Sequence, residues 1–360
     1  MEDVETLQNN ECIDGMIHGY GKLTPTATSA NMILSKILLE HFPHQNQRND
    51  NENELFHLDL GTADGCNALP LVSATLQLSP KITFFGFSLE SRNQFKLKER
   101  FQDTQQENTR DSSRVKFEYQ QGSYFQSENW NIIPEMDLVT IVTADHWLQN
   151  KEIERIGFTQ ANLNMSKADK KQYESLWMEQ METLFKEVGK KLRTSNSCFL
   201  IGGLVELENG RFSCDLGYRL LYQSYLEVVK TPTVSSSVDF QSFFPTFGLR
   251  ERLGLADSSF RKKLLFPTIR QTIPCGVSSR YLTQQTQLKT NPELRKQFAH
   301  ELRKVVESWS RWKFNHLEDV IGTEIYEKLE LHFESWLRTN SIPENGVLPY
   351  YYEFVGFRRA

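Results

Sequence analysis

The segment LFHLDLGTADGCN, residues 55–67, gives the strongest indication of the fold. Its first six residues form an apolar-rich strand pattern, and the turn that follows contains Gly61 and Gly65. The next segment, ALPLVSATLQL, has the composition of a buried helix. A strand, a glycine-containing turn and a helix in this order are typical of the first βα unit of a doubly wound sheet. The sequence therefore predicts an α/β fold built on a parallel sheet.

The alternation of strands and helices continues after this unit. Strands are predicted at residues 81–87, 115–119, 136–142 and 197–205, with a last strand in the aromatic run YYYEFVGF at 350–357. The first four are spaced as α/β units would space them. A helix is predicted at 29–42 with Ser29 as its N-cap, and another at 92–101.

The clearest helix follows Ser166, which forms a capping pattern with Asp169. Apolar side chains recur on one face of this helix from Tyr173 to Leu192, at helical spacing. We interpret this face, which includes Trp177, as part of the core and not as a binding surface.

The domain organisation follows from these elements. A sheet-based core is expected at residues 28–150, 166–205 and 346–360, a segment covering cofactor and substrate at 1–27, and a mainly helical cap at 151–165 and 206–345. Within the cap, helices are predicted at 216–229 and 292–314. LLFPTIRQTI, around residues 264–273, is a candidate strand, although Pro267 within it cannot donate to a sheet.

Composition limits the function classes. The chain has 360 residues, of which 39% are hydrophobic and 24% charged, as in an ordinary globular protein. Lys plus Arg is 41 and Asp plus Glu is 46, which gives a net charge of −5. This charge provides no general attraction to nucleic acid or to an anionic membrane. We therefore expect a small-molecule partner.

Targeting signals and cysteine usage predict the compartment. No stretch approaches the ~18 to 20 apolar residues of a membrane span, and the acidic start MEDVETLQNNE lacks the features of a signal peptide. The five cysteines are widely spaced and include no C-x-x-C pair. They argue against a disulfide framework and a zinc site. We expect reduced thiols, no bound metal and a cytoplasmic protein.

The turn after the first strand is the first candidate site. Gly61 and Gly65 permit a tight turn and close approach of a ligand to the backbone, and Asp59 can accept hydrogen bonds from an amino group or a hydroxyl. The spacing G-x-x-x-G differs from the G-x-G-x-x-G that cradles a pyrophosphate. A cofactor without phosphates is therefore favoured over a dinucleotide, and S-adenosylmethionine fits that description.

Two further motifs follow later strands. In GSY, residues 122–124, the Ser123 hydroxyl and the Tyr124 ring are placed to bond to and stack on an adenine. In TADHWL, residues 143–148, the Trp147 indole can donate to an anionic acceptor and His146 can add a second polar contact. All three motifs stand at carboxyl ends of strands, where α/β sheets bind ligands.

Together these motifs resemble the plant-type carboxyl methyltransferases, often called the SABATH family, which includes salicylate, benzoate and jasmonate methylating enzymes and the caffeine-pathway N-methyltransferases. DLGTADGCN matches the family's DLG-C-S-S-G-P-N, GSY its G-S-F, and ADHWL its S-L-H-W-L. The W-x-x-Q of the long helix recurs as Trp177 and Gln180. The resemblance implies a Rossmann-like class I methyltransferase sheet with an inserted helical cap, in which the last strand is antiparallel.

The resemblance also implies residue roles. Cofactor binding is implied for Tyr20, Thr24, Asp59, Gly61, Asn67, Ser88, Leu89, Ser123 and Tyr124. Trp147, with His146 beside it, would face the methyl acceptor, and the protein would be a homodimer. Two departures are visible: Ala27 stands where the family has the glutamine that grips a substrate carboxylate, and GFSLE leaves Glu90 as the nearest acid to the ribose.

The function expected is therefore transfer of a methyl group from S-adenosylmethionine to the carboxylate of a small or medium-sized apolar acid, by in-line displacement. A carboxylate with a pKa near ~4 is already ionised at neutral pH and requires no general base. Ala27 leaves open an N- or phenol O-methyltransferase, for which His146 would be a candidate acid or base. GFSLE and the weak N-terminal match leave open a binding protein without turnover.

Overall fold

The computed structural model describes residues 25–42, 54–62, 66–88, 114–146, 148, 166–229, 243–314 and 319–360. Its centre is an eight-stranded sheet in the order β3-β2-β1-β4-β5-β8-β6, with β7 also paired to β8. The strands are β1 Glu54–Leu60, β2 Lys81–Ser88, β3 Val115–Gln121, β4 Leu138–Val142, β5 Cys198–Leu204, β6 Phe260–Leu264, β7 Ile269–Ile273 and β8 Tyr350–Arg359.

The pairing of β1 defines the centre of the sheet. β1 to β5 are parallel, and the order along the chain reverses between β1 and β4. Asp59 lies opposite Gly86 of β2 and Thr140 of β4. This reversal is the topological switch point at which ligands bind in open α/β sheets.

The last strand is antiparallel, as predicted. β8 pairs along its length with β5 on one side and with β6 and then β7 on the other. The predicted strand around 264–273 is in fact two short strands, which end and begin on either side of Pro267. The proline, which has no N–H to donate, stands in the interruption between them.

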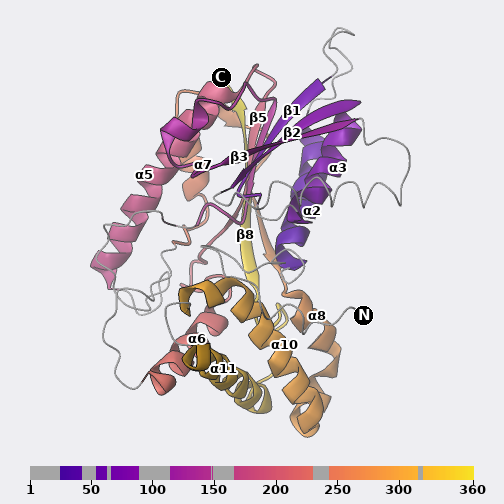
Figure 1. Cartoon of the computed structure of the whole chain (residues 1–360), viewed down its shortest axis with the longest axis vertical. Helices are drawn as coiled ribbons and strands as arrows, with labels where there is room; N and C mark the ends of the chain where they lie inside the picture. The colour runs from indigo at the N-terminus through magenta and orange to yellow at the C-terminus, as the bar shows by residue number, and fades with distance from the viewer. Residues whose placement is uncertain are drawn as a thin grey trace.

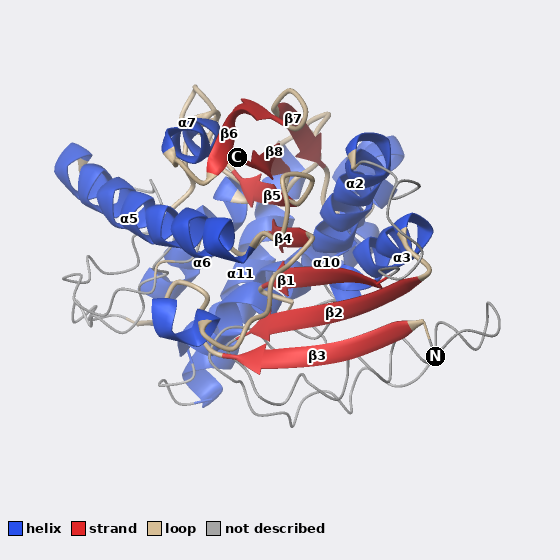
Figure 2. Cartoon of the chain, turned by 90° about the horizontal axis from the view of Figure 1, so that it is seen from above, coloured by secondary structure: helices blue, strands red, loops and turns tan. Residues whose placement is uncertain are grey.

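Helices cover both faces of the sheet. α2 Pro25–His41 and α3 Leu69–Leu78 lie on one face, and α5 Lys167–Lys191 and α7 Leu249–Ala256 on the other (Figure 2). The cap helices are α6 Asp215–Val228, α8 Gly276–Tyr281, α9 Gln285–Thr290, α10 Pro292–Ser310 and α11 Asp319–Thr339, and the short 3-10 turns are η2 Cys66–Ala68, η4 Ser127–Trp130, η6 Leu282–Gln284 and η7 Arg311–Phe314. Figure 1 shows α6, α8, α10 and α11 gathered at one end of the molecule, opposite the C-terminus. Because β8 runs to that terminus against the parallel strands, β1 to β5 end on the side of the cap.

The apolar face predicted for residues 173–192 is confirmed as core. Ser166 is the N-cap of α5 and accepts a hydrogen bond from the Asp169 backbone N–H at 3.2 Å. Tyr173 and Trp177 are fully buried, and they belong to the core cluster that includes Leu58 of β1. Burial of this stripe fixes α5 against the sheet.

The start of the first helix differs from the prediction. α2 begins at Pro25, so Ser29 lies inside the helix and is not its N-cap. Proline is tolerated in the first turn because that turn has no intrahelical partner for its N–H. The predicted helix at 92–101 lies outside the described residues.

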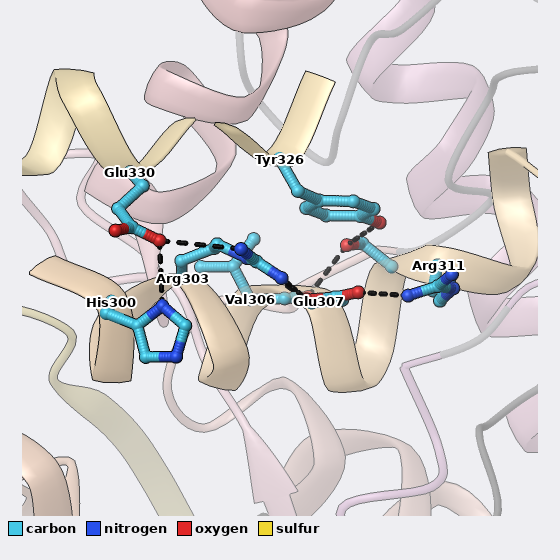
Figure 3. Close-up of polar contacts among 8 residues, drawn as sticks. His300, Arg303, Val306, Glu307, Arg311, Tyr326 and Glu330 are labelled. Carbon is cyan, nitrogen blue, oxygen red and sulfur yellow. Dashed lines mark hydrogen bonds and ion pairs between the residues drawn. The ribbon is translucent and has the colours of Figure 1, made fainter. Parts of the chain in front are cut away.

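The cap is held together by polar contacts as well as by its core. α10 packs on α11, and α11 packs on α6. Glu330 of α11 accepts hydrogen bonds from His300 at 2.9 Å and from Arg303 at 3.4 Å (Figure 3). Glu307 of α10 forms ion pairs with Arg303 of the same helix and with Arg311 of the turn that follows it. Within the described ranges, no helix combines the length and apolarity needed to cross a membrane.

Candidate functional site

The three sequence motifs meet at the ends of the parallel strands. The Tyr124 hydroxyl, from the loop after β3, donates a hydrogen bond to the Ala144 carbonyl, in the loop after β4, at 2.8 Å. Gly61, directly after β1, has a φ of +80°, and a Cβ there would lie 2.5 Å from the Ala144 Cβ. Only glycine fits so close an approach in that conformation. The loops after β1, β3 and β4 therefore touch one another at Gly61.

Asp59 is a buried carboxylate at this junction, with 5% of its surface exposed. Thr140 of β4 lies 2.8 Å from its Oδ1, and the Thr62 hydroxyl donates to its backbone carbonyl at 2.7 Å. Burial raises the pKa of Asp59 to about 7, although the hydroxyls of Thr140 and Thr62 oppose that rise. A buried carboxylate that titrates near neutrality can exchange its proton for a bound cation.

Ser123 and Tyr124 are part of a turn that is held by hydrogen bonds. Ser123 accepts a hydrogen bond from the Phe125 backbone N–H at 3.2 Å, and its carbonyl accepts one from the Asn129 amide at 2.9 Å. Gly122 has a φ of +144°, and a Cβ there would collide with Asn129. Tyr124 lies edge-on to Phe87 of β2. These contacts show how the turn after β3 is held, and the cofactor roles predicted for Ser123 and Tyr124 stay predictions.

Asn67 connects the first loop to the N-terminal helix. It lies in the turn η2, and its Oδ1 accepts a hydrogen bond from the Thr28 hydroxyl of α2 at 2.7 Å. The amide therefore fixes α2 against the segment that follows the glycine turn. Its predicted contact with the cofactor stays a prediction.

The loop after β4 is anchored by a buried ion cluster. Asp145 Oδ2 accepts from Arg250 Nε at 2.6 Å, and Glu353 of β8 accepts from Arg250 Nη1 at 3.1 Å. All three side chains are fully buried. Trp177 of α5 donates to the Asp145 carbonyl at 2.8 Å, and its ring lies beneath the guanidinium. The loop that carries His146 is thus held from α5, α7 and β8.

His146 is buried and stacks on Phe244, with ring centroids 5.4 Å apart. Burial lowers the pKa of its imidazole to about 4, and Arg250 lowers it further while Asp145 raises it. The ring is therefore neutral at pH 7. A neutral imidazole can donate one hydrogen bond and accept another, but a pKa so far below neutrality makes it a weak base.

Several predicted site residues lie outside the described part of the chain: Tyr20, Thr24, Gly65, Leu89, Glu90 and Trp147. Ser88 is the last residue of β2, and only its backbone is described. Ala27, which occupies the place of the family's glutamine, is buried in α2. Within the described ranges, no three His, Cys, Asp or Glu side chains are grouped so as to hold a metal ion.

Sequence reasoning missed two residues at the site. His57 of β1 contacts Thr140, and Arg250 holds Asp145. The signal for His57 was a polar residue in the middle of a strand buried on both faces, where near-continuous apolar residues are the rule. Arg250 gave no local signal, since it lies 105 residues from Asp145 in the chain.

Comparisons with known proteins support the fold. No protein-family model matches the chain, and no curated protein matches its sequence. A structure of loganic acid methyltransferase with SAH is similar to this chain with a TM-score of 0.65 at 13% identity, over 94% of each chain. Coclaurine N-methyltransferase bound to N-methylheliamine and SAH gives 0.39 at 10% identity, over 91% of this chain and 72% of that one. The first likeness confirms the predicted Rossmann-like class I methyltransferase fold.

Proposed function

We propose that this protein is an S-adenosylmethionine-dependent methyltransferase that converts the carboxylate of a small or medium-sized apolar acid to its methyl ester. The observation that carries this proposal is the meeting of three motif loops around Gly61, at the switch point of the sheet. Loganic acid methyltransferase, which shares the fold, is named for an acid and was solved with SAH. The motif resemblance to the SABATH family supports the same activity.

The residues present fit the cofactor. Asp59 is a buried carboxylate at the end of β1 and forms no ion pair within the described ranges, so it can receive the ammonium group of an amino acid. Gly61, on the same loop, allows the loop after β4 to approach closely at Ala144. Asn67, Ser123 and Tyr124 are proposed to line the rest of the site, with Tyr20, Thr24, Ser88 and Leu89. When bound, S-adenosylmethionine supplies an electrophilic methyl group.

The chain's own contribution is placement of the acceptor. Trp147 and His146 are proposed to hold its carboxylate, with the neutral His146 donating one hydrogen bond. An acid with a pKa near ~4 reaches the site ionised, so no residue has to remove a proton. Orientation of two reactants can lower a barrier by about 7 kcal/mol or more. The low pKa of His146 disfavours the amine alternative, in which this imidazole would have to act as a base.

A transfer assay tests the function. Labelled S-adenosylmethionine is incubated with the protein and panels of carboxylic acids, phenols and amines, after its binding and that of S-adenosylhomocysteine have been measured by calorimetry. We expect transfer to at least one acid. Transfer to phenols or amines alone would establish the alternative that Ala27 suggests. Binding of both forms of the cofactor with no transfer to any acceptor would make the chain a binding protein.

Asp59→Asn is expected to raise the cofactor dissociation constant at least about tenfold, which corresponds to ~1.4 kcal/mol. The amide keeps the size of the carboxylate and its contact with Thr140, but it cannot become negative. Calorimetric titration of the folded variant measures the effect. Asp257→Asn, at the C-cap of α7, is the control and should leave affinity unchanged. Wild-type affinity in Asp59→Asn would show that the ammonium binds elsewhere.

We also propose a cytoplasmic location and a homodimer. Cys198, Cys214 and Cys275 are buried and free, as expected of thiols in a reducing compartment. The homodimer rests on the family resemblance. Light scattering after size-exclusion chromatography would measure it directly.

A further inference from the structure

His57 links Asp59 to the helix behind the sheet. Its Nε2 lies 2.9 Å from the Thr140 hydroxyl, which itself lies 2.8 Å from Asp59 Oδ1. Its Nδ1 lies 3.0 Å from the hydroxyl of Thr75 in α3, and that hydroxyl donates to the Leu71 carbonyl at 2.7 Å. His57, Thr75 and Thr140 are all fully buried. We call this run, from Asp59 through Thr140 and His57 to Thr75, the proton chain.

The proton chain makes four hydrogen-bonding contacts, but only three hydrogens are available for them when His57 is neutral and Asp59 is ionised. Each of its contacts, including the one to Leu71, requires one hydrogen between two heavy atoms. Thr75, Thr140 and neutral His57 contribute one hydrogen each. In one of the four contacts, two buried acceptor atoms would then face each other with no hydrogen between them. An unsatisfied buried acceptor costs free energy. As long as the Thr75 hydroxyl donates to the Leu71 carbonyl, as it does here, the proton chain is fully hydrogen-bonded only if it holds one additional proton.

That proton belongs on Asp59. Burial lowers the pKa of His57 to about 3 and raises the pKa of Asp59 to about 7, so the carboxyl holds the proton in preference to the imidazole. Neutral His57 then accepts from Thr140, and the protonated carboxyl donates to Thr140.

Among the described residues, none provides a compensating positive charge beside Asp59. β2 offers Gly86 opposite Asp59 and Phe84 opposite His57. The Tyr124 phenol, from the loop after β3, is near enough for Asp59 and Asp145 to raise its pKa further above its usual value, beyond the larger effect of burial. Asp145 itself is paired with Arg250. In the described part of the chain, a bound ammonium would be the first cation beside Asp59.

The proton chain can also be complete after it has lost the proton. The ionised carboxylate then accepts from Thr140, and Thr140 accepts from His57 if the imidazole carries its hydrogen on Nε2. The Thr75 hydroxyl turns from Leu71 to His57 Nδ1. The Leu71 carbonyl loses little, because inside α3 it also accepts the helical hydrogen bond from the Thr75 backbone N–H. Both protonation states are therefore fully hydrogen-bonded, and a change of His57 tautomer connects them.

Resting on the proposed function, we propose that capture of the methyl donor's ammonium group by Asp59 expels one proton from the proton chain, and that His57 is the positioning residue that keeps the chain hydrogen-bonded in both states. Two bonds break and one forms: the carboxyl O–H of Asp59 breaks and its proton goes to solvent, while the hydrogen of His57 moves from Nδ1 to Nε2. The carboxylate gains the ammonium as its partner. The charge of the buried site then changes little on binding.

Calorimetry with S-adenosylhomocysteine tests the inference on the whole protein. Heats measured at pH 6 in two buffers of different ionisation enthalpy give the number of protons released. We expect close to one proton per ligand, and a dissociation constant that falls by up to tenfold between pH 5.5 and 6.5. The ligand's amino group, with a usual pKa of about 7.7 to 8.0, stays charged throughout this range. Binding without proton release at pH 6 would overturn the inference and leave the function standing.

Two variants test the role of His57. In Thr75→Val the Nδ1 atom loses its acceptor, so the imidazole favours its hydrogen on Nε2 and Asp59 favours the ionised form. In His57→Leu the Thr140 hydroxyl loses its histidine acceptor and can donate only to Asp59 within the proton chain, which favours the ionised carboxylate. Both variants should release less than half of the wild-type proton count at pH 6, although neither residue is proposed to touch the ligand. An unchanged count in folded Thr75→Val would overturn the inference.

The controls match these variants. Thr183→Val, in α5, removes another threonine hydroxyl that donates to a helix carbonyl, here that of Glu179 at 3.1 Å. His300→Leu removes a histidine of the cap. Both should keep the wild-type proton count.

A measurement without ligand separates the inference from the function. Because the folded-state pKa of Asp59 is raised, its contribution to stability is present below about pH 4 and is lost as the pH rises to about 7. The folding equilibrium constant of the wild type, relative to that of Asp59→Asn, should fall by up to tenfold per pH unit in this range. A flat ratio overturns the proton chain even if the cofactor binds. If the folding equilibrium constant falls with pH as expected but no cofactor binds at any pH, the proposed function and the proton release on binding are wrong, whereas the proton chain stands.

Discussion

Arg250→Met is expected to lower the free energy of unfolding by about 3–5 kcal/mol, because it leaves two buried carboxylates without their partner. Arg250, Asp145 and Glu353 all have fully buried side chains. The guanidinium also donates to the Leu204 carbonyl at 2.9 Å, so the same change leaves a buried backbone acceptor unpaired. Methionine fills part of the volume but replaces none of these hydrogen bonds.

Urea denaturation at neutral pH measures this loss, and the m value shows whether unfolding stays two-state. The control is Arg280→Met, in which the arginine belongs to a solvent-exposed pair with Glu301. Such pairs contribute about 0–1 kcal/mol. Adding Asp145→Asn and Glu353→Gln to Arg250→Met should recover part of the stability, because uncharged groups cost less to bury. If the single Arg250 variant is as stable as the control, the cluster does not hold the loop after β4.

Gly61→Ala is expected to cost about 2–5 kcal/mol and to weaken cofactor binding more than tenfold. A left-handed backbone costs about 1–2 kcal/mol for a residue with a Cβ. The new Cβ would also lie 2.5 Å from that of Ala144, which forces the backbone of one loop to move. Forcing additional atoms into a packed site costs about 1–3 kcal/mol. The movement separates the loops that form the proposed cofactor site.

Two variants separate the cost of the left-handed backbone from the cost of the contact with Ala144. Gly210 has nearly the same φ, +78°, but among the described residues a Cβ there would meet only Glu206 Oε1, at 3.8 Å. Gly210→Ala should therefore show the backbone cost alone and leave binding intact. The double variant Gly61→Ala with Ala144→Gly removes the colliding atom, and the next contact of the new Cβ is at 3.7 Å. It should regain cofactor affinity. If it does not, the close approach of these loops is not what Gly61 provides.

Strands β1, β2, β4, β5 and β8 could be predicted because each is an apolar-rich run bounded by turn residues, and β3 because apolar and polar residues alternate along it. The position of YYYEFVGF also gave the antiparallel direction of β8, through the family resemblance. β6 and β7 were harder, since each has only five residues and Pro267 argues against a continuous strand. The start of α2 was missed by a turn because Ser29 is a good cap in isolation, whereas Pro25 begins the helix.

The candidate site was predicted in part. The strand-end motifs placed Gly61, Tyr124 and the loop after β4 near one another, because carboxyl ends of parallel strands share one edge of a sheet. Residues that support this edge from other layers could not be placed in the same way. The contact of His57 with α3 depends on how that helix packs, and a sequence pattern does not state it.

The interruption between β6 and β7, which both pair with β8, limits how two copies of this protein can associate. An exposed row of backbone N–H and C=O groups invites strand addition and aggregation, and natural proteins block it with prolines, interruptions and charged side chains. One edge of the sheet, formed by β6 and β7, is interrupted at Pro267, and the edge strand on the opposite side, β3, exposes the charged side chains of Lys116 and Glu118. Neither edge favours pairing with a strand of a second molecule. A homodimer of this chain would therefore assemble through its helices or loops.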